Sequence, residues 1–127
     1  MLKLPSLIYA NKFLPTPLPP QGTFTNQTIL ITGGTTGLGL ATAVHFLTLG
    51  ASRVIITART ASKGTSAKAE IESKAKLKAQ DVGVVEVRVL DMSTFAGIKK
   101  FADEVTREVD SVDYVLLNAG VTKRGFA

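Results

Sequence analysis

Apolar and polar residues follow two repeating patterns from residue 26 onward, one typical of buried strands and one typical of amphipathic helices. Short runs of apolar and β-branched residues predict four strands, at Thr28–Thr32, Arg53–Ala58, Val84–Leu90 and Val112–Asn118. Between them, apolar residues three and four positions apart predict three helices, at Thr36–Leu49, Ser62–Gln80 and Phe95–Val109. Strands that alternate with helices in this way predict βαβ units and a parallel sheet.

The same pattern predicts which faces are buried. The expected inner face of the second helix is Ala67, Ile71, Ala75 and Ala79, and that of the third is Phe95, Ile98, Phe101, Ala102 and Val105. The fourth strand is apolar at successive positions from Tyr114 to Leu117, which predicts burial on both of its faces. Right-handed crossovers favour a Rossmann-type, doubly wound α/β sheet in the order 3-2-1-4, incomplete beyond the fourth strand. That apolar edge needs a further part of a longer chain, a partner or a second copy to cover it.

The N-terminal segment differs in composition from the rest. All five prolines lie within the first 20 residues, so residues 1–25 are interpreted as an extended, Pro-rich arm and residues 26–127 as the Rossmann domain. Apolar residues of the arm are expected to pack on the domain; the alternative is a contact with a membrane or a partner. They are Leu4, Leu7, Ile8, Phe13 and Leu14.

Composition and charge exclude several classes of protein. There is no cysteine and only one histidine, His45, so neither a disulfide scaffold nor a metal site is predicted. The net charge is +5, but the densest lysines alternate with acids four positions away, as on a solvent-facing helix, and nucleic-acid binding is not predicted. No apolar run is long enough for a membrane span and no signal peptide is evident, so a cytoplasmic location is expected. The lysines and acids that lie four positions apart form the pairs Lys68/Glu72, Glu70/Lys74 and Glu72/Lys76.

Chemistry is concentrated in the turn Thr32–Gly39, which joins the first strand to the first helix. Gly33 and Gly34 permit a tight turn, Gly37 leaves room where a pyrophosphate approaches, and Gly39 permits close packing of helix and strand. Backbone N–H groups at a helix N-terminus attract negative phosphates, and Thr35 and Thr36 add hydroxyl donors. The turn therefore predicts a site for a phosphate-bearing ligand.

Its spacing, T-G-x-x-x-G-x-G, resembles that of the short-chain dehydrogenase/reductase family. Three further segments match this family in order: Arg59 at the end of the second strand, Asp91-Met92 after the third, and Asn118-Ala119-Gly120 after the fourth. The resemblance implies that Asp91 binds the adenine amino group and that Asn118-Ala119-Gly120 braces the fourth strand beside the adenosine ribose. The candidate cofactor-binding residues are Gly33, Thr35, Thr36, Gly37, Leu38, Gly39, Arg59, Lys63, Asp91, Asn118 and Gly120.

Arg59 bears on the choice between the two possible cofactors, NAD and NADP. It lies 20 residues after Gly39, where an NAD-binding protein places an acid for the ribose hydroxyls, and there is no Asp or Glu between Gly39 and Glu70. A cation at this position suits the 2′-phosphate of NADP, and Lys63 could add a second one. NADP is therefore the predicted cofactor.

The family also uses a Ser, a Tyr and a Lys, the last two as Y-x-x-x-K. Neither Tyr9 nor Tyr114 is followed by a lysine four positions on, so no catalytic residue is assigned. The resulting hypothesis is an NADP-dependent short-chain dehydrogenase/reductase that transfers hydride between NADP(H) and a small carbonyl or alcohol substrate, cut short before its catalytic half. The alternative is a non-catalytic dinucleotide-binding or interaction protein that uses the open sheet edge.

Overall fold

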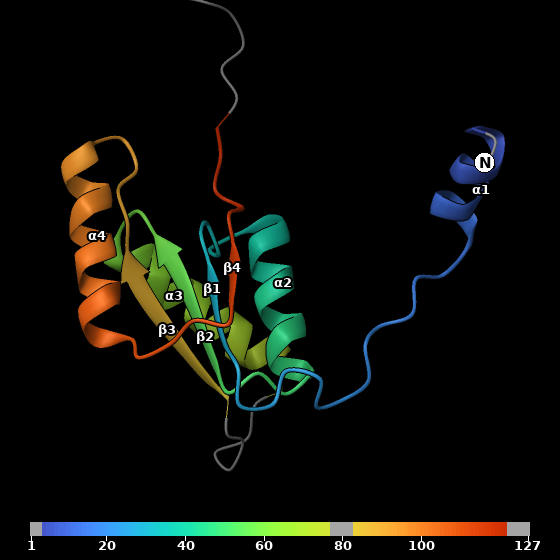
Figure 1. Cartoon of the computed structure of the whole chain (residues 1–127), viewed down its shortest axis with the longest axis horizontal. Coiled ribbons are helices and arrows are strands. Elements are labelled where there is room, and N and C mark those ends of the chain that lie inside the picture. Colours follow the sequence, from blue (N-terminus) through green and yellow to red (C-terminus); the bar gives the residue numbers. More distant parts are fainter. Residues whose placement is uncertain (1–3, 77–82, 122–127) are drawn as a thin grey trace, which may run out of the picture.

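The computed structural model describes residues 4–76 and 83–121, which form a parallel sheet with helices on both faces and a separate N-terminal helix (Figure 1). The strands are β1 (Thr28–Ile31), β2 (Arg53–Ala58), β3 (Val84–Val89) and β4 (Tyr114–Leu116). The helices are α1 (Leu4–Phe13), α2 (Gly37–Thr48), α3 (Ala61–Lys74) and α4 (Phe95–Glu108). The strand order β3-β2-β1-β4, with parallel pairing throughout, confirms the predicted Rossmann-type topology.

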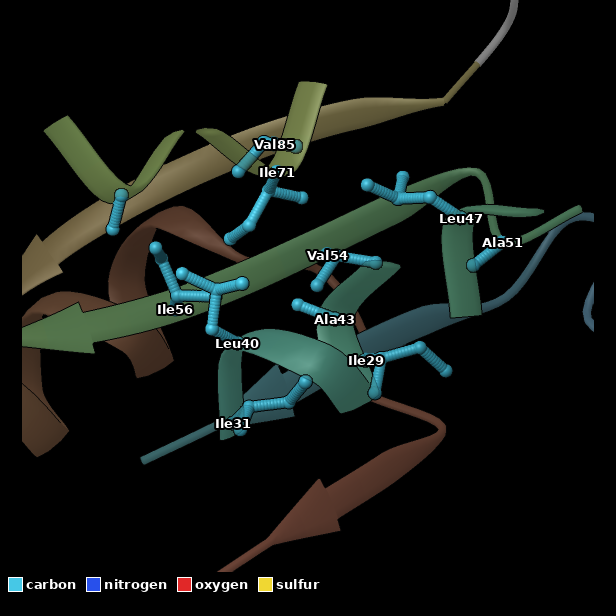
Figure 2. Packing of buried hydrophobic residues seen from close by; sticks show 11 residues of the cluster. Ile29, Ile31, Leu40, Ala43, Leu47, Ala51, Val54, Ile56, Ile71 and Val85 are labelled. Atoms are coloured by element: carbon cyan, nitrogen blue, oxygen red, sulfur yellow. The ribbon is translucent and has the colours of Figure 1, made fainter. Parts of the chain in front are cut away.

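Two hydrophobic layers hold the sheet between its helices. On one face, residues from β1, β2 and β3 pack against α2 and α3 (Figure 2). Ile29, Val54 and Val85 occupy neighbouring strands in this layer. On the other face, Leu30 and Ile55 pack with Phe101 of α4. The alternation of side chains along β1 and β2 thus supplies both layers, as expected of a sheet covered on both sides.

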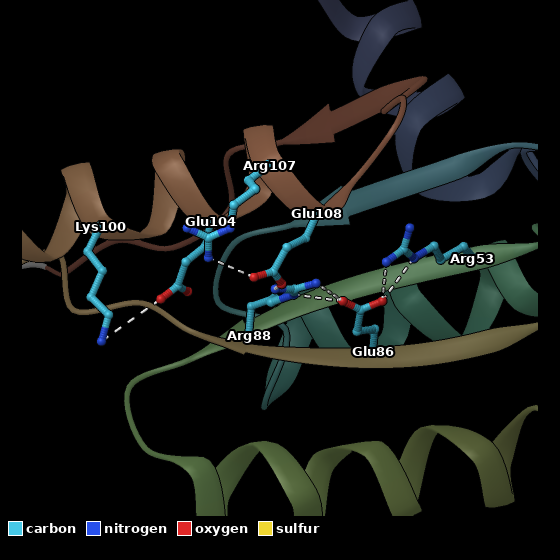
Figure 3. Close-up of polar contacts among 7 residues, drawn as sticks. All are labelled: Arg53, Glu86, Arg88, Lys100, Glu104, Arg107 and Glu108. Atoms are coloured by element: carbon cyan, nitrogen blue, oxygen red, sulfur yellow. Dashed lines mark hydrogen bonds and ion pairs between the residues drawn. The ribbon is translucent and has the colours of Figure 1, made fainter.

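The α4 face also carries a row of charged side chains (Figure 3). Glu86 of β3 accepts hydrogen bonds from Arg53 of β2, with Nε at 2.9 Å, and from Arg88 of β3, with Nε at 2.6 Å. Arg88 also pairs with Glu108 at the end of α4. Burial by itself raises the pKa of Glu86, but the hydrogen bonds and charges of the two arginines outweigh it and hold the pKa below its ordinary value.

The second predicted helix is shorter than its sequence pattern suggests. Helix α3 ends at Lys74, and Lys76 adopts a left-handed φ of +53°. Gln80, Ala79 and the other residues of 77–82 lie outside the described residues. The predicted surface pairs Lys68–Glu72 and Glu70–Lys74 form, at 3.8 and 2.6 Å.

The predicted burial of α4 and β4 is partly wrong. Phe95 is 92% exposed and Ile98 is also exposed, because the residues that pack on this face of the sheet lie later in the segment, at Phe101 and Val105 of α4 and at Val109 just after it. Val115 of β4 is 54% exposed and Leu117 more so. Within residues 4–76 and 83–121, no strand pairs with the outer edge of β4.

The prediction of an extended arm over residues 1–25 is wrong for residues 4–13, which form α1. Pro5 lies in the first turn, where its missing N–H costs no helical hydrogen bond, and the other four prolines follow the end of the helix. Leu7 and Phe13 are exposed, and α1 stands away from the sheet, so this segment does not pack on the domain (Figure 1). None of the described helices is long and apolar enough to cross a membrane.

Residues 21–25, also assigned to the arm, are instead attached to the domain. The backbone N–H of Gly22 donates to the Leu49 carbonyl oxygen at 3.1 Å. The Phe24 ring packs edge-on against Phe46, with centroids 4.7 Å apart, and against Tyr114, at 5.8 Å. The apolar residue that anchors the N-terminal segment is therefore Phe24.

Candidate functional site

A cleft of about 670 Å³ opens at the carboxyl ends of the strands. It lies between β1 and β4, where the strand order of the parallel sheet reverses, the place at which open α/β sheets bind ligands. Its walls come from the segments that follow all four strands. They are Gly33, Thr35, Thr36, Thr57, Ala58, Arg59, Leu90, Asp91, Met92, Ser93, Asn118, Ala119, Gly120 and Val121.

Two glycines of the turn after β1 have distinct structural roles. Gly37 has a φ of +58°, and a Cβ atom there would meet open space. At Gly39, a Cβ atom would lie 2.4 Å from the carbonyl oxygen of Gly33 and 2.6 Å from Nδ2 of Asn118. Gly37 therefore leaves one side of the turn open, whereas Gly39 permits α2 to pack against the turn and β4, as its position in the sequence predicts.

The N-terminus of α2 has no side-chain cap. Thr36 occupies the cap position, but its side chain makes no capping hydrogen bond. In α3, by contrast, Oγ1 of Thr60 accepts from the Lys63 N–H at 3.4 Å, and in α4, Oγ1 of Thr94 accepts from the Gly97 N–H at 3.0 Å. The first-turn N–H groups of α2 thus lack the side-chain acceptor present in the other two helices and can serve an anion.

Hydrogen bonds from the neighbouring strands fix the glycine-rich turn. Oγ1 of Thr32, a buried side chain, accepts from the N–H groups of Asn118 at 3.1 Å and Ala119 at 3.2 Å. Nδ2 of Asn118 donates back to the carbonyl oxygens of Thr32 at 3.2 Å and Gly33 at 3.1 Å. Oγ1 of the buried Thr57 in β2 accepts from the Gly33 N–H at 3.0 Å. The turn is therefore held from both β2 and β4.

Asp91 and Arg59 form the polar wall opposite the turn. Oδ1 of Asp91 accepts from the hydroxyl of Ser93 at 2.6 Å and from its backbone N–H at 2.9 Å. These two hydrogen bonds and the nearby charge of Arg59 hold the pKa of the exposed Asp91 carboxyl below its ordinary value. Asp91 is therefore ionised near neutral pH and oriented by Ser93, and Arg59 is left exposed at the rim of the cleft.

The cleft brings together seven of the eleven predicted site residues. They are Gly33, Thr35, Thr36, Arg59, Asp91, Asn118 and Gly120. Of the others, Gly37 lines a neighbouring hollow of about 410 Å³, Gly39 is buried behind the turn, and Leu38 is 75% exposed. Lys63 is exposed in the first turn of α3 and does not line the cleft.

Sequence reasoning placed Thr32 at the start of the glycine-rich turn and Thr57 in the second strand, but it assigned neither side chain a role in holding the turn. Among the described residues, Thr32 and Thr57 are the only buried polar side chains, and each lies at the carboxyl end of a strand. A hydroxyl residue at the end of a run of β-branched apolar residues, beside a glycine-rich turn, is the signal that could have found them. In the described part of the chain, no cluster of three or more His, Cys, Asp or Glu residues could hold a metal ion.

Comparisons with known proteins agree with this geometry. The family model described as short chain dehydrogenase matches residues 27–127. The short chain dehydrogenase/reductase dmxR8 of Cryptosporiopsis sp. is 39% identical over 114 residues, which cover 90% of this chain and 34% of that protein. The short-chain dehydrogenase/reductase phmF of Phaeosphaeria nodorum is 42% identical over 102 residues, which cover 80% of this chain and 29% of that protein.

Solved structures show the same fold. A short chain dehydrogenase structure from Escherichia coli CFT073, in complex with NADPH, superposes with a TM-score of 0.66 at 25% identity. The match covers 81% of this chain and 41% of that one. The chain thus spans about a third of the length of the curated relatives that it matches. A Rossmann-type sheet, a glycine-rich turn at its switch point and the match over residues 27–127 together establish that the chain belongs to the short chain dehydrogenase family of oxidoreductases.

Proposed function

We propose that the cleft binds NADP(H), with the phosphates at the N-terminus of α2 and the adenosine end between Arg59 and Asp91. The observation that carries this proposal is that the glycine-rich turn and Arg59 line the same cleft, although 20 residues separate Gly39 from Arg59. The uncapped first turn of α2 suits a pyrophosphate, and the open space at Gly37 leaves room for its approach. A cleft of about 670 Å³ is of the size that ligand pockets usually have.

Arg59 determines the choice of nucleotide in this proposal. Its side chain is exposed at the end of β2, where the guanidinium can bind a 2′-phosphate with two parallel hydrogen bonds. Among the residues that the structure describes, Asp91 is the only carboxylate that lines the cleft, and it accepts a hydrogen bond from Ser93. Lys63 lies outside the cleft wall but on the turn of α3 that follows Arg59, and we assign it a weaker, electrostatic part.

The remaining residues hold the nucleoside. We assign the ionised Asp91 to the adenine amino group, as acceptor, because two hydrogen bonds from Ser93 already orient its carboxylate. Asn118 positions the turn through its hydrogen bonds to Thr32 and Gly33, and Gly120 lets the backbone lie close to the ribose. Thr35 and Thr36 are assigned to the phosphates, whereas Leu38 and Gly39 act through the shape of the turn.

For the whole protein we propose hydride transfer between NADP(H) and a carbonyl or alcohol substrate. The bound nucleotide supplies the hydride acceptor or donor, and the residues described here bind and orient it. The acid–base chemistry of the reaction is not assigned to any residue of this chain. The NADPH complex of the related Escherichia coli protein, which shares the fold, supports the nucleotide assignment.

A second candidate is a non-catalytic dinucleotide-binding protein whose open sheet edge binds a partner. The observation in its favour is the exposure of apolar side chains along and beside β4, at Tyr114, Val115 and Leu117. Both candidates share the nucleotide site. An assay of NADPH turnover by the protein that contains this chain distinguishes the two candidates, because turnover is expected of the enzyme and not of the non-catalytic protein.

The test of the nucleotide site is titration of the purified chain with NADPH and NADH. Arg59→Glu should weaken NADPH binding about 10- to 100-fold and change NADH binding little, because only NADPH carries the 2′-phosphate. Arg107→Glu makes the same change of charge at the far end of α4 and is the matched control. If neither NADPH nor NADH binds at high micromolar concentration, the proposed site is wrong, and equal binding of both nucleotides contradicts the role of Arg59.

A further inference from the structure

Helix α1 presents apolar side chains that the domain does not cover. Leu7, Ile8, Tyr9 and Phe13 are all exposed, with Tyr9 at 58% and Phe13 at 61%. Spaced by 100° per residue, these side chains extend around most of the circumference of the helix. A helix that is apolar around most of its surface is normally buried, so α1 requires a covering environment that the rest of the described chain does not provide.

The charge around this helix has a single sign. In the sequence, Lys3 and Lys12 are the only Lys, Arg, Asp or Glu residues from residue 1 to residue 52. The Nζ atom of Lys12 lies 5.5 Å from the centre of the Phe13 ring, and the Tyr9 and Phe13 rings lie 5.2 Å apart. A lysine and two aromatic rings, one with a hydroxyl, are the side chains that favour the boundary between lipid headgroups and acyl chains.

The length of α1 determines how it could meet a bilayer. Ten helical residues span about 15 Å, half the hydrocarbon thickness, so the helix is too short to cross. A short helix that carries aromatic rings and a lysine can instead lie at the bilayer interface, where these side chains are favoured. The four prolines of residues 15–20 act as a semi-rigid spacer between α1 and the domain, which begins its contacts at Gln21 with a hydrogen bond to the Thr48 carbonyl oxygen at 2.9 Å.

We infer that α1 binds the surface of an anionic lipid bilayer, with Tyr9 and Phe13 inserted at the headgroup boundary and Lys12 among the phosphates. The lack of any acidic residue in the N-terminal segment favours an anionic lipid surface over the α1 helix of a second copy, because that pairing would place like charges together. The inference is independent of the nucleotide site, since α1 contributes nothing to the cleft.

The first experiment is co-sedimentation of the 127-residue chain with vesicles of phosphatidylcholine alone or with about one third phosphatidylserine. The chain should bind the phosphatidylserine vesicles, and raising the salt from about 0.1 M to about 0.5 M should weaken binding several-fold. Replacing both Tyr9→Ala and Phe13→Ala should lower the partition coefficient about tenfold or more. Phe95→Ala, which removes a fully exposed ring from α4, is the matched control and should bind as the wild type does.

Fluorescence gives a second, direct measurement, because the chain has no tryptophan. Tyr9→Trp should shift its emission to the blue on addition of the phosphatidylserine vesicles and be quenched by brominated acyl chains, whereas Phe95→Trp should not respond. Three results would overturn the inference: no binding to either vesicle, equal binding to both, or an equal loss with Phe95→Ala. Concentration-dependent dimerisation that Tyr9→Ala and Phe13→Ala abolish, without vesicle binding, would assign α1 to a second copy instead.

Discussion

Nδ2 of Asn118 lies 3.1 Å from the carbonyl oxygen of Gly33, and this hydrogen bond joins two segments that are 85 residues apart in the chain. The same amide donates to the carbonyl oxygen of Thr32 at 3.2 Å. Because the glycine-rich turn has little side-chain packing of its own, these contacts with the end of β4 determine where its N–H groups point. The nucleotide site thus depends on the segment after β4 as much as on the turn itself.

Asn118→Asp should therefore loosen the turn. The carboxylate has nearly the same shape but cannot donate, and it would face two carbonyl oxygens. We expect a loss of about 1–2 kcal/mol in the free energy of unfolding, measured in urea, together with weaker nucleotide binding. Asn11→Asp makes the same chemical change in α1 and should leave the stability of the domain unchanged. Equal effects of the two substitutions would contradict a specific role for Asn118.

Thr32→Val tests the other half of this contact. The substitution keeps the shape of a buried side chain but removes Oγ1, the acceptor for the N–H groups of Asn118 and Ala119. Leaving these donors without an acceptor should cost about 1–3 kcal/mol of stability, read from thermal or urea unfolding. Thr32→Ser keeps the oxygen and loses only a methyl group, so it should cost less. A serine variant as unstable as the valine variant would show that packing, and not hydrogen bonding, is what matters at Thr32.

Gly37→Ala and Gly39→Ala should separate ligand binding from folding. A methyl group at Gly39 would lie 2.4 Å from the backbone oxygen of Gly33, which cannot move aside without moving the turn, and about 2–3 kcal/mol of stability should be lost. At Gly37 there is space for the methyl group, so the cost is about 1–2 kcal/mol from the φ of +58°. NADPH affinity should nonetheless fall at least about tenfold with Gly37→Ala, because the methyl group enters the proposed phosphate site. Unfolding curves and nucleotide titrations of both variants decide this; the reverse ranking in stability would contradict it.

The sequence pattern was sufficient for the topology and for most of the cleft. Strand order follows from the βαβ alternation, and Gly33, Arg59, Asp91 and Asn118 meet because the carboxyl ends of parallel strands share one edge. Lys63 could not be placed in the same way. Its distance from the cleft depends on how α3 leaves β2, where Thr60 caps the helix, and four residues of sequence separation do not determine that direction.

Burial at the sheet edge was predicted less well, for a physical reason. Periodicity shows which positions of a helix or strand are apolar, but not what covers them. Phe95 has the spacing of an inner-face residue, yet it lies in the first turn of α4, before the part of that helix that packs on the sheet. Val115 follows the pattern of a doubly buried strand, but in the described residues β4 is the outermost strand. Conversely, helix α1 is not expected from the sequence, because the five prolines of residues 1–20 suggest an extended chain, although Pro5 lies in a first turn, where it is tolerated.

The charged row on the α4 face should make stability sensitive to acid. The pKa of Glu86 lies below its ordinary value of 4.5, because two arginines more than offset its burial, so the ionised form favours the folded state. This stabilisation is fully present above pH 4.5 and is lost as the pH falls through the pKa of the folded protein.

Glu86→Gln should therefore be less stable than the wild type near neutral pH, and the difference should shrink below about pH 4.5. Urea unfolding at about pH 7, 5, 4 and 3 measures it. Glu70→Gln, which removes a carboxylate from an exposed ion pair with Lys74, is the matched control. If the difference between Glu86→Gln and the wild type stayed constant over this range, the two arginines would not be acting on the charge of Glu86, and the row would contribute only through its packing.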